Sequence, residues 1–327
     1  MASIRIRNGR WQARVRRHGY PIVAQTFISR SDAERWARSV EAAMDRGTFV
    51  DVTEAGRTTL GDLVERYMRE VSPTMRSAHD DLIRLKALQR HSICKLSMTA
   101  LSAARVAAFR DERLRSVQPA TVIRELAYLS SIINHARREW GINIANPVAL
   151  VRKPVAPQGR ERVLDEQEEA KLLAALEPVG RRSRWLKPLV VLALETGMRR
   201  GELLSLRWER VDLTRRVARL LITKNGHSRT VPLSSQAVEV LSRLPRHISG
   251  VVFPMTPYAT AAAFEKAVRR AGIEDLRFHD LRHTAITRLA QRLPNVIELA
   301  AVTGHRSLKM LQRYYHPSAS ELARKLG

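Results

Sequence analysis

The stretch 151–162, VRKPVAPQGRER, constrains the fold of this chain more than any other segment. Its two prolines each lack the backbone N–H that a regular helix or an inner strand requires, and its glycine adds conformational freedom. Four of its twelve residues are Arg or Lys. We therefore predict an extended basic linker over 151–162, with separate folded domains before and after it. A length of 327 residues leaves room for two or three domains in all.

The segment 1–57 has the pattern of a small β-sheet packed against one helix. Asn8-Gly9 is a hairpin-type turn, and apolar and mostly basic residues alternate over 10–16 after it. Residues 22–27 predict a further strand. Ser31–Glu34 has the spacing of a capping box for a helix that Gly47 can end. The arginines on the polar face of the second strand predict either a solvated surface or a DNA contact.

From Thr58 to residue 150 the apolar period becomes helical. Apolar residues recur at helical spacing on two successive segments, at Leu60, Leu63, Val64 and Tyr67 and then at Leu82, Leu85 and Leu88. Two more helices are expected near 99–115 and 119–140, and Gly141 closes the second. The region 58–150 is therefore predicted to be a four-helix unit.

The segment 163–327 is predicted to be mostly helical with a β-hairpin. The hairpin joins VARLLIT to SRTVPL through the Asn225-Gly226 turn. Helices are expected near 165–177, 185–195, 234–244, 258–271, 280–292 and 295–302, with a final pair at 307–315 and 318–326. The fold class predicted for the chain is mainly α with small β elements (α+β).

The net charge of +25 indicates a polyanionic partner, although genomic base composition can also inflate Arg, which supplies 48 of the 57 basic residues. The excess is spread over 1–57, 58–157 and 158–327 as +5, +7 and +13. No apolar run approaches the ~18 residues of a membrane span, and the first ten residues lack the apolar segment of a secretory signal. The single cysteine, Cys94, excludes an internal disulfide and a multi-cysteine metal site. We expect a cytoplasmic, nucleoid-associated protein without a membrane partner.

Four short elements after the linker carry the candidate chemistry. Each has an ordinary explanation when taken singly: an Arg–Glu pair at spacing three is usually a surface salt bridge, a Lys beside a turn is usually solvated, and a His after Gly is often a helix cap. The elements are TGMRRGE at 196–202, Lys224 before the Asn225-Gly226 turn, FHDLRH at 278–283, and GHRSL at 304–308 followed by RYYH at 313–316.

Together and in this order, these elements resemble the motifs of the tyrosine recombinase (phage integrase) family. That family has an Arg in T-G-x-R-x-x-E, a Lys on a β-hairpin, H-x-x-R, G-H, and a Tyr nine residues after that His; the spacing selects Tyr314 over Tyr315. The resemblance implies that the catalytic residues are Arg199, Lys224, His279, Arg282, His305 and the nucleophile Tyr314. One departure is Thr303, where the family usually has Leu, and Lys224 is assigned on spacing alone.

The resemblance extends along the whole chain and assigns its domains. It implies an arm-type DNA-binding domain at 1–57, a helical core-binding domain at 58–150, the linker at 151–162 and a catalytic domain at 163–327. By the same resemblance, four protomers hold two double-stranded DNA sites and exchange strands through a Holliday junction. A DNA-bending host factor and an excisionase are possible further partners. The tail after Pro317 has the character of the short helix that such proteins dock on a neighbouring protomer.

The chemistry of phosphodiester cleavage fits these residue types. Two guanidiniums, Arg199 and Arg282, can clamp the nonbridging oxygens while staying charged, and His305 can donate a further hydrogen bond. Tyr314 needs a base, for which His279 is the candidate, and Lys224 suits protonation of the leaving 5′ oxygen. We therefore expect no metal, ATP or other cofactor.

The function predicted is a site-specific recombinase, specifically the integrase of a phage or other mobile element, acting through a 3′-phosphotyrosyl intermediate. Three alternatives stay open. A type IB topoisomerase uses similar residues, a DNA-binding regulator needs only the charge and the helices, and a metal-dependent transposase uses carboxylates. The bases of the attachment site, the direction of the reaction and the host element do not follow from the sequence.

Overall fold

A computed structural model describes residues 2–49, 51, 53–75, 77–157, 159–180, 182–221, 228–305, 307–314 and 319–326. The chain forms two compact units, residues 1–158 and 159–327, and the division falls inside the predicted linker. Helices dominate, and the described strands form two three-stranded antiparallel sheets. The predicted fold class, mainly α with small β elements, is confirmed.

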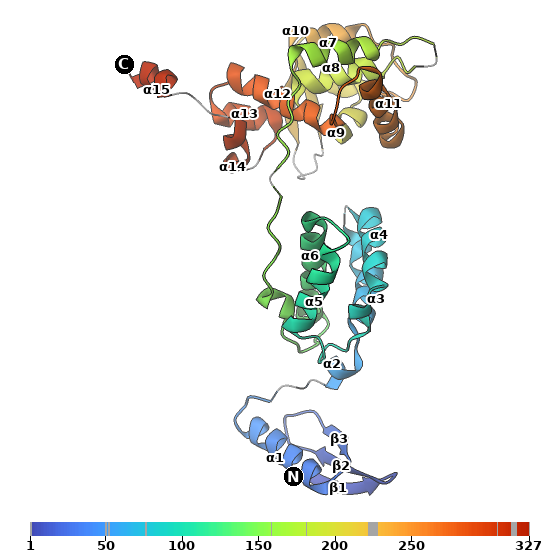
Figure 1. The fold of residues 1–327 in the computed structure, drawn as a ribbon, viewed down its shortest axis with the longest axis vertical. Coiled ribbons are helices and arrows are strands. Elements are labelled where there is room, and N and C mark those ends of the chain that lie inside the picture. The colour runs from blue at the N-terminus through green and yellow to red at the C-terminus, as the bar shows by residue number, and fades with distance from the viewer. Residues whose placement is uncertain are drawn as a thin grey trace. The chain divides into compact units, whose positions relative to one another are not determined.

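The amino-terminal sheet contains β1 (Ala2–Arg7), β2 (Arg10–Val15) and β3 (Val23–Phe27) in that order, with α1 (Arg30–Asp45) packed on it (Figure 1). Asn8 and Gly9 both have positive φ, 52° and 73°, as a two-residue hairpin turn requires. The predicted capping box at Ser31–Glu34 is wrong by two residues. Ser29 has extended backbone and its Oγ accepts from Asp32 N at 3.1 Å, so the helix begins before Ser31.

The rest of the first unit is helical. The predicted apolar face of α3 (Leu60–Glu70) is buried, with Leu60, Leu63, Val64 and Tyr67 all at most 4% exposed. These residues share one core with side chains from the other helices. Gly141, with φ 69°, follows the last long helix, as expected. The elements are α2 (Thr53–Arg57), α3 (Leu60–Glu70), α4 (Ala78–Gln89), α5 (Ala103–Leu114) and α6 (Pro119–Glu139).

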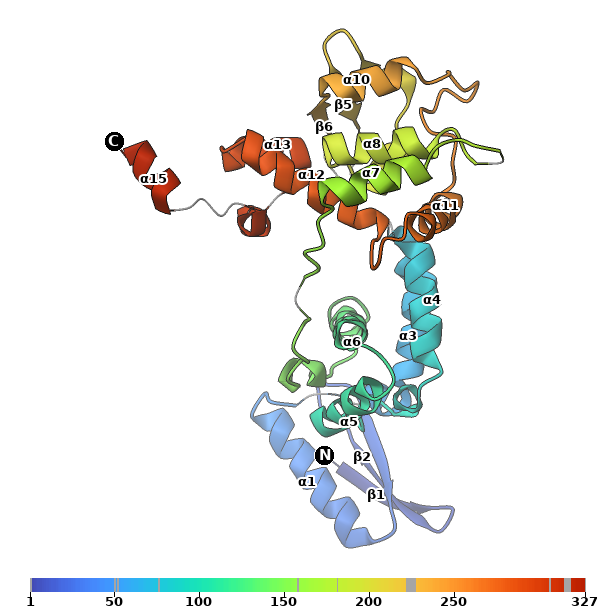
Figure 2. The same ribbon diagram turned by 45° about the horizontal axis from the view of Figure 1, so that its top comes forward.

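The second unit packs helices around a small sheet. α8 (Leu186–Thr196) lies beside α12 (Phe278–Arg292) and α10 (Ser235–Ser242). Figure 2 shows β5 (Val217–Leu220) and β6 (Arg229–Pro232) near α10. The sequence did not predict β4, a two-residue strand that pairs with β5. The Asn225-Gly226 turn lies outside the described residues. The elements are α7 (Glu166–Ala175), α8 (Leu186–Thr196), α9 (Arg200–Leu204), β4 (Val211–Asp212), β5 (Val217–Leu220), β6 (Arg229–Pro232), α10 (Ser235–Ser242), α11 (Pro257–Arg270), α12 (Phe278–Arg292), α13 (Val296–Thr303), α14 (Leu308–Leu311), the 3₁₀ helix η5 (Gln312–Tyr314) and α15 (Ala319–Leu326).

Two hydrophobic cores of unequal size support the second unit. The main core gathers buried side chains from α7 to the start of α12. A smaller cluster lies under α13, α14 and η5, and the buried members among the described residues are Ile286, Ala290, Leu299 and Leu311. No helix in the described part of the chain is long and apolar enough to cross a membrane.

The end of the predicted linker is attached to the second unit. Residues 152–157 and 159–165 form neither helix nor strand, as the prolines predict. Arg160 Nε nevertheless donates to both carboxylate oxygens of Asp280, at 2.9 and 3.0 Å, and its terminal nitrogens bond to Asp275. The chain is therefore fixed to the start of α12 from residue 160 onward.

Candidate active site

Arg199 is held at the start of α9 by the carboxylate of Glu202. α8 ends at Gly197, whose φ of 61° lets the backbone reverse direction. The backbone N–H of Arg199 donates to Glu202 Oε2 and its guanidinium donates to Oε1, both at 2.9 Å. The predicted Arg–Glu pair is thus not a surface salt bridge, because Glu202 is only 6% exposed.

A second guanidinium, from Arg229 at the start of β6, binds the same carboxylate. Its two terminal nitrogens donate to the two oxygens of Glu202 at 2.9 and 2.8 Å. Burial alone would raise the pKa of Glu202, but the hydrogen bonds from Arg229 and from the Arg199 backbone outweigh it and hold the pKa at about 2. Glu202 is therefore ionised at neutral pH and orients two cations.

Arg282, the second predicted cation, is buried on α12. It donates to the backbone oxygen of Gly197 and, at 2.7 Å, to that of Thr303. Burial, followed by the charge of Arg199, lowers the pKa of Arg282 to about 10, so the group stays charged at neutral pH. Both acceptors are backbone carbonyls at helix ends, which fixes the guanidinium before any substrate binds.

His305 follows Gly304, whose φ of 70° ends α13. Its Nδ1 lies 2.7 Å from Thr303 Oγ1, and its Nε2 lies 3.5 Å from a terminal nitrogen of Arg282. Burial, followed by the charges of Arg282, Arg199 and Arg229, lowers the pKa of His305 to about 4. The imidazole is therefore neutral at neutral pH.

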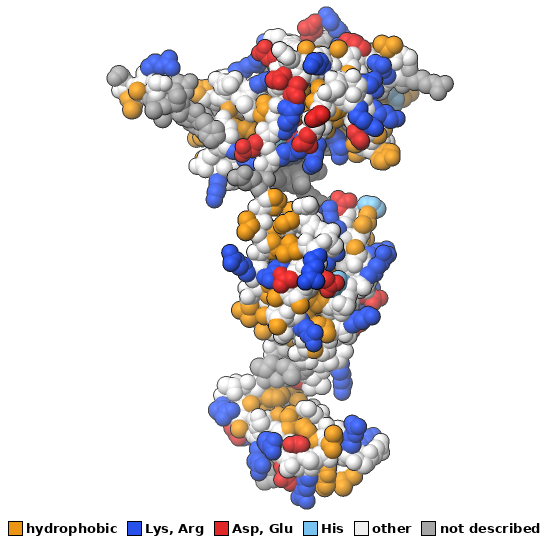
Figure 3. Space-filling view, in the orientation of Figure 1, with side chains coloured by type: hydrophobic (Ala, Val, Ile, Leu, Met, Phe, Trp, Pro, Cys, Tyr) orange, Lys and Arg blue, Asp and Glu red, His pale blue; other side chains and the backbone are white. Residues whose placement is uncertain are grey.

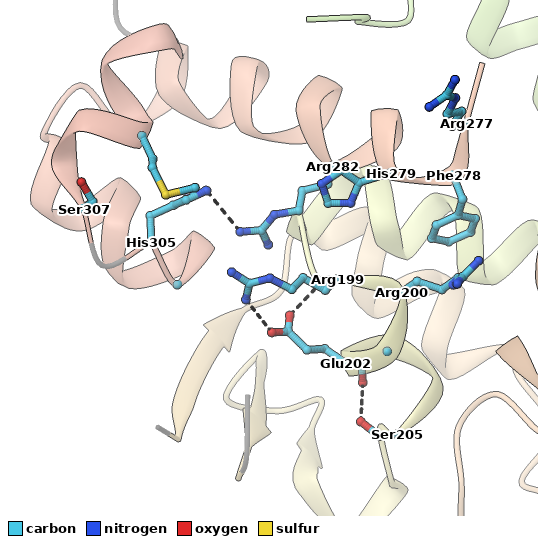
Figure 4. Close-up of a pocket in the computed structure, with 13 residues that line it drawn as sticks. Arg199, Arg200, Glu202, Ser205, Arg277, Phe278, His279, Arg282, His305 and Ser307 are labelled. Atoms are coloured by element: carbon cyan, nitrogen blue, oxygen red, sulfur yellow. Dashed lines mark hydrogen bonds and ion pairs between the residues drawn. The ribbon is translucent and has the colours of Figure 1, made fainter. Parts of the chain in front are cut away.

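One cleft of about 960 Å³ is lined by Arg199, Glu202, Arg282 and His305. Figure 4 shows Arg199, Arg282 and His305 pointing toward a common space, with Glu202 beneath Arg199. Four of the six predicted residues, Arg199, His279, Arg282 and His305, line the cleft, and Lys224 lies outside the described residues. The other lining residues are Arg200, Gly201, Glu202, Ser205, Arg277, Phe278, Gly304, Ser307 and Met310.

Tyr314 lies on η5, next to the cleft residues but outside the lining of the cleft. Its hydroxyl hydrogen-bonds to Nδ1 of His283, and the two rings are 5.8 Å apart between centroids. The sequence named His279 as the candidate base; the structure instead places His283, one helical turn further along α12, at the hydroxyl. Helix α12 presents both histidines on one side, with their ring centroids 5.5 Å apart.

The environment keeps Tyr314 protonated in this state. Burial raises the pKa of its hydroxyl, and the charges of Arg313 and Arg282 oppose that effect only in part. Burial, followed by the charge of His279, lowers the pKa of His283 from its ordinary value of 6.5. A neutral imidazole is thus in contact with a protonated phenol, the arrangement required for a later proton transfer.

Three residues of the site were missed from the sequence: Arg229, His283 as a partner of Tyr314, and Thr303 as a partner of His305. Arg229 had one usable signal, an arginine three residues after the predicted Asn225-Gly226 turn, at the start of a strand with a buried face. Among the described residues, no cluster of three or more His, Cys, Asp or Glu side chains could hold a metal ion.

Comparison with known proteins identifies two matching family profiles and several relatives. The "Phage integrase family" profile matches residues 162–321, and the "Phage integrase, N-terminal domain" profile matches residues 56–154. A shufflon-specific DNA recombinase of Escherichia coli is 41% identical over 279 residues, which are 83% of this chain and 72% of the relative. A putative integrase/recombinase of Haemophilus influenzae is 35% identical, over 98% of this chain and 89% of the relative.

A solved structure shows the same fold. The lambda integrase tetramer bound to a Holliday junction matches with a TM-score of 0.67 over 96% of this chain and 94% of that chain. The sequence identity is 19%, so this likeness concerns the fold alone.

Proposed function

We propose that this chain, which belongs to the phage integrase family, is a site-specific DNA recombinase. It cuts and rejoins DNA through a phosphotyrosine intermediate. One observation carries the proposal: two fixed guanidiniums and a histidine converge in one cleft beside the half-buried side chain of Tyr314. Basic side chains are also spread over the visible face of each unit (Figure 3), which suits a DNA substrate.

The cleft binds the scissile phosphate in this proposal. Arg199 and Arg282 donate hydrogen bonds to the nonbridging oxygens and stabilise the charge that builds up there in the transition state. Because Glu202 and the backbone carbonyls already orient these guanidiniums, little reorganisation is needed when DNA arrives. His305 supplies a further donor to the same phosphate.

Tyr314 is the nucleophile. Its oxygen attacks phosphorus, and His283, already hydrogen-bonded to the hydroxyl, takes the proton. The bond from phosphorus to the 5′ oxygen breaks, and we assign the proton that this oxygen needs to Lys224. Attack of another strand's 5′-hydroxyl on the phosphotyrosine reverses the step and reseals DNA without ATP.

Trapping on a nicked suicide substrate tests the proposal. Loss of the short 5′-hydroxyl strand prevents resealing, so the wild-type chain should accumulate a covalent DNA adduct, whereas Tyr314→Phe should bind DNA and form none. Tyr258→Phe is the matched control, because Tyr258 is 85% exposed. Binding without an adduct favours a non-catalytic regulator, relaxation of supercoils without site preference favours a type IB topoisomerase, and a magnesium requirement favours a transposase.

We also propose the division of labour among the domains. Residues 1–57 bind arm-type sites, residues 58–150 and 163–327 bind the core site, and 151–162 connects them. Deletion of residues 1–47 should spare cleavage of an isolated core site and abolish recombination of complete attachment sites. Equal recombination by the truncated and intact chains would contradict an arm-type role.

The assembly we propose is a homotetramer on two double-stranded DNA sites in the cytoplasm, by analogy with lambda integrase, whose tetramer binds a Holliday junction. Integration for a mobile element, with a bending factor and an excisionase, is the first candidate role. The 41% identity to a shufflon-specific DNA recombinase favours a second, recombination of a shufflon. Recombination assays that supply either a pair of attachment sites or a pair of shufflon repeats distinguish the two.

A further inference from the structure

We propose that Thr303 is a positioning residue that keeps the proton of neutral His305 on Nδ1, so that His305 donates to the scissile phosphate only after it takes up a second proton. The inference rests on the proposed function, since it concerns how the same cleft receives its phosphate. It concerns the position at which the sequence departs from the usual Leu of the family.

The hydroxyl of Thr303 fixes the direction of two hydrogen bonds. Thr303 is fully buried at the end of α13, and its Oγ1 lies 2.7 Å from the backbone oxygen of Leu299. Two oxygens at this distance need a proton between them, and the carbonyl has none to give. The one hydroxyl proton therefore lies toward Leu299. His305 Nδ1, 2.7 Å from the same Oγ1, must then be the donor and carry a hydrogen.

The other ring nitrogen of neutral His305 is consequently a bare acceptor. Nε2 faces a terminal nitrogen of Arg282, which can only donate, at 3.5 Å. A phosphate oxygen is also an acceptor, so a bare Nε2 cannot bond to it. His305 can engage the phosphate in two ways: by moving its proton from Nδ1 to Nε2, or by gaining a second proton.

Thr303 favours the gain of a second proton over the transfer of the first proton to Nε2. Moving the proton to Nε2 would leave two buried acceptors facing each other without a proton between them. The pair would be Nδ1 and Oγ1 or, if the hydroxyl turned toward Nδ1, Oγ1 and the Leu299 oxygen. Gaining a proton keeps the Nδ1–H bond to Thr303 and adds an Nε2–H donor. The imidazolium that results carries a positive charge to the phosphate.

The charges around His305 explain why the second proton arrives with the substrate. Cations face the ring from several elements: Arg282 on α12, Arg199 before α9, Arg229 on β6 and Arg313 on η5. Glu202 is a carboxylate in this network, and it already binds Arg199 and Arg229. In the free protein these charges and burial oppose protonation. A bound phosphate adds negative charge at the same place and reverses the balance.

The substitution Thr303→Val isolates the hydroxyl. It replaces Oγ1 with a methyl group of similar volume, and the Thr303 carbonyl that accepts from Arg282 belongs to the backbone and stays in place. Without the hydroxyl, neutral His305 is free to carry its proton on Nε2. Thr303→Ser keeps the hydroxyl and is the matched control.

The tautomer can be measured directly in the full-length free protein. Two-bond ¹H–¹⁵N correlation spectra of ¹⁵N-histidine-labelled protein distinguish protonated from bare ring nitrogens, and His305→Gln assigns the signals. We expect protonated Nδ1 in the wild type and in Thr303→Ser, and protonated Nε2 in Thr303→Val. A wild-type His305 with protonated Nε2 overturns the proposal, whether or not the valine variant folds.

The kinetic consequence appears in the ratio of wild-type to Thr303→Val trapping rates on the nicked substrate between about pH 6 and 9. Titrations of Tyr314 and of other groups cancel in this ratio. We expect it to fall with rising pH, approaching tenfold per unit above the pKa of DNA-bound His305, and the ratio for Thr303→Ser to stay flat. A flat ratio for valine overturns the proposal while leaving the recombinase function intact, whereas failure of the wild type to form any adduct overturns the function itself.

Discussion

The two halves of the site are built differently. The clamp, defined as Arg199, Arg229 and Arg282 with Glu202, rests on the main core and has hydrogen bonds to buried partners. The nucleophile segment, described at 296–305 and 307–314, packs on the small cluster that includes Leu299 and Leu311, and Val302 also contacts the main core. The cations are therefore set before substrate arrives, whereas the nucleophile sits on a part of the fold with little buried apolar area to hold it.

This difference suits the chemistry. Electrostatic stabilisation is effective when the donors need no reorganisation, so a fixed clamp lowers the barrier. Tyr314, by contrast, does not line the cleft. Its hydroxyl must therefore move toward the phosphorus from outside the cleft. Segments with few buried contacts open at low free-energy cost, which allows that approach.

The largest effect on the clamp is expected from Arg229→Gln. It removes one of the two cations on a buried carboxylate, and breaking such a pair costs about 3 kcal/mol or more. Hydrogen exchange of peptides from α9 and β6 should report the loss. Arg243→Gln is the control, because Arg243 makes an ion pair of 2.7 Å with Glu239 but is 78% exposed, and it should cost under about 1 kcal/mol.

The same variant has a predicted pH dependence. The pKa of Glu202 is about 2 in the folded protein against an ordinary 4.5, so its contribution to stability is complete above pH 4.5 and is lost as pH falls through 2. The difference in unfolding free energy between wild type and Arg229→Gln should therefore shrink over that range. A constant difference would show that Arg229 does not stabilise the fold through ionised Glu202.

Arg282→Ala tests whether the clamp acts in the chemical step. DNA affinity should stay near normal, while single-turnover cleavage should slow by about 10²–10³-fold, the usual cost of losing one preorganised donor. Arg288→Ala is the matched control: Arg288 is also on α12 and pairs with Glu169 away from the cleft. Equal losses from both variants would mean that α12 has been disrupted rather than the clamp.

His283→Asn tests whether His283 is the base that takes the proton of Tyr314. If His283 takes the proton of Tyr314, its loss should slow cleavage by about 10²-fold, the low end for general base catalysis. Because the pKa of His283 lies below 6.5, this group should not limit the wild-type rate until the pH falls below that value. His279→Asn is the companion variant, and a larger loss there would return the base role to His279.

The smallest effect is expected from Leu311→Ala, which tests whether the two halves of the site can open separately. Leu311→Ala removes a fully buried side chain from the small cluster and should cost about 2–3 kcal/mol, near the low end for buried leucine because the site can collapse. Hydrogen exchange should rise in α13 and η5 and stay unchanged in α9. Leu308→Ala, at a position 49% exposed, should cost under about 0.5 kcal/mol. Increased exchange throughout the unit would contradict two separable halves.

The sequence predicted the elements and the candidate residues better than their contacts. The apolar period of residues 60–67 placed α3 and its buried face, because burial of one stripe leaves a strong signal. The helix start at Ser29 was missed, since Ser31 and Glu34 have the same local spacing as a true capping box. β4 is too short to show an alternation.

The sequence could not predict the contacts between distant segments. Nothing local indicates that Arg229 would share Glu202 with Arg199, or that the chain after Gly304 would bring Tyr314 to His283 rather than to His279. Thr303 stood out only as a departure from a motif. Its role depends on the directions of three hydrogen bonds, which exist only in the folded site.

We propose that the oxygen of Tyr314 forms the covalent bond to DNA. Mass spectrometry of the peptide cross-linked to a trapped suicide substrate identifies the attached residue. We expect a single nucleotide adduct on Tyr314, absent from Tyr314→Phe and retained in Tyr315→Phe, although Tyr315 lies outside the described residues. An adduct on Tyr315, on a serine or on no residue would contradict it.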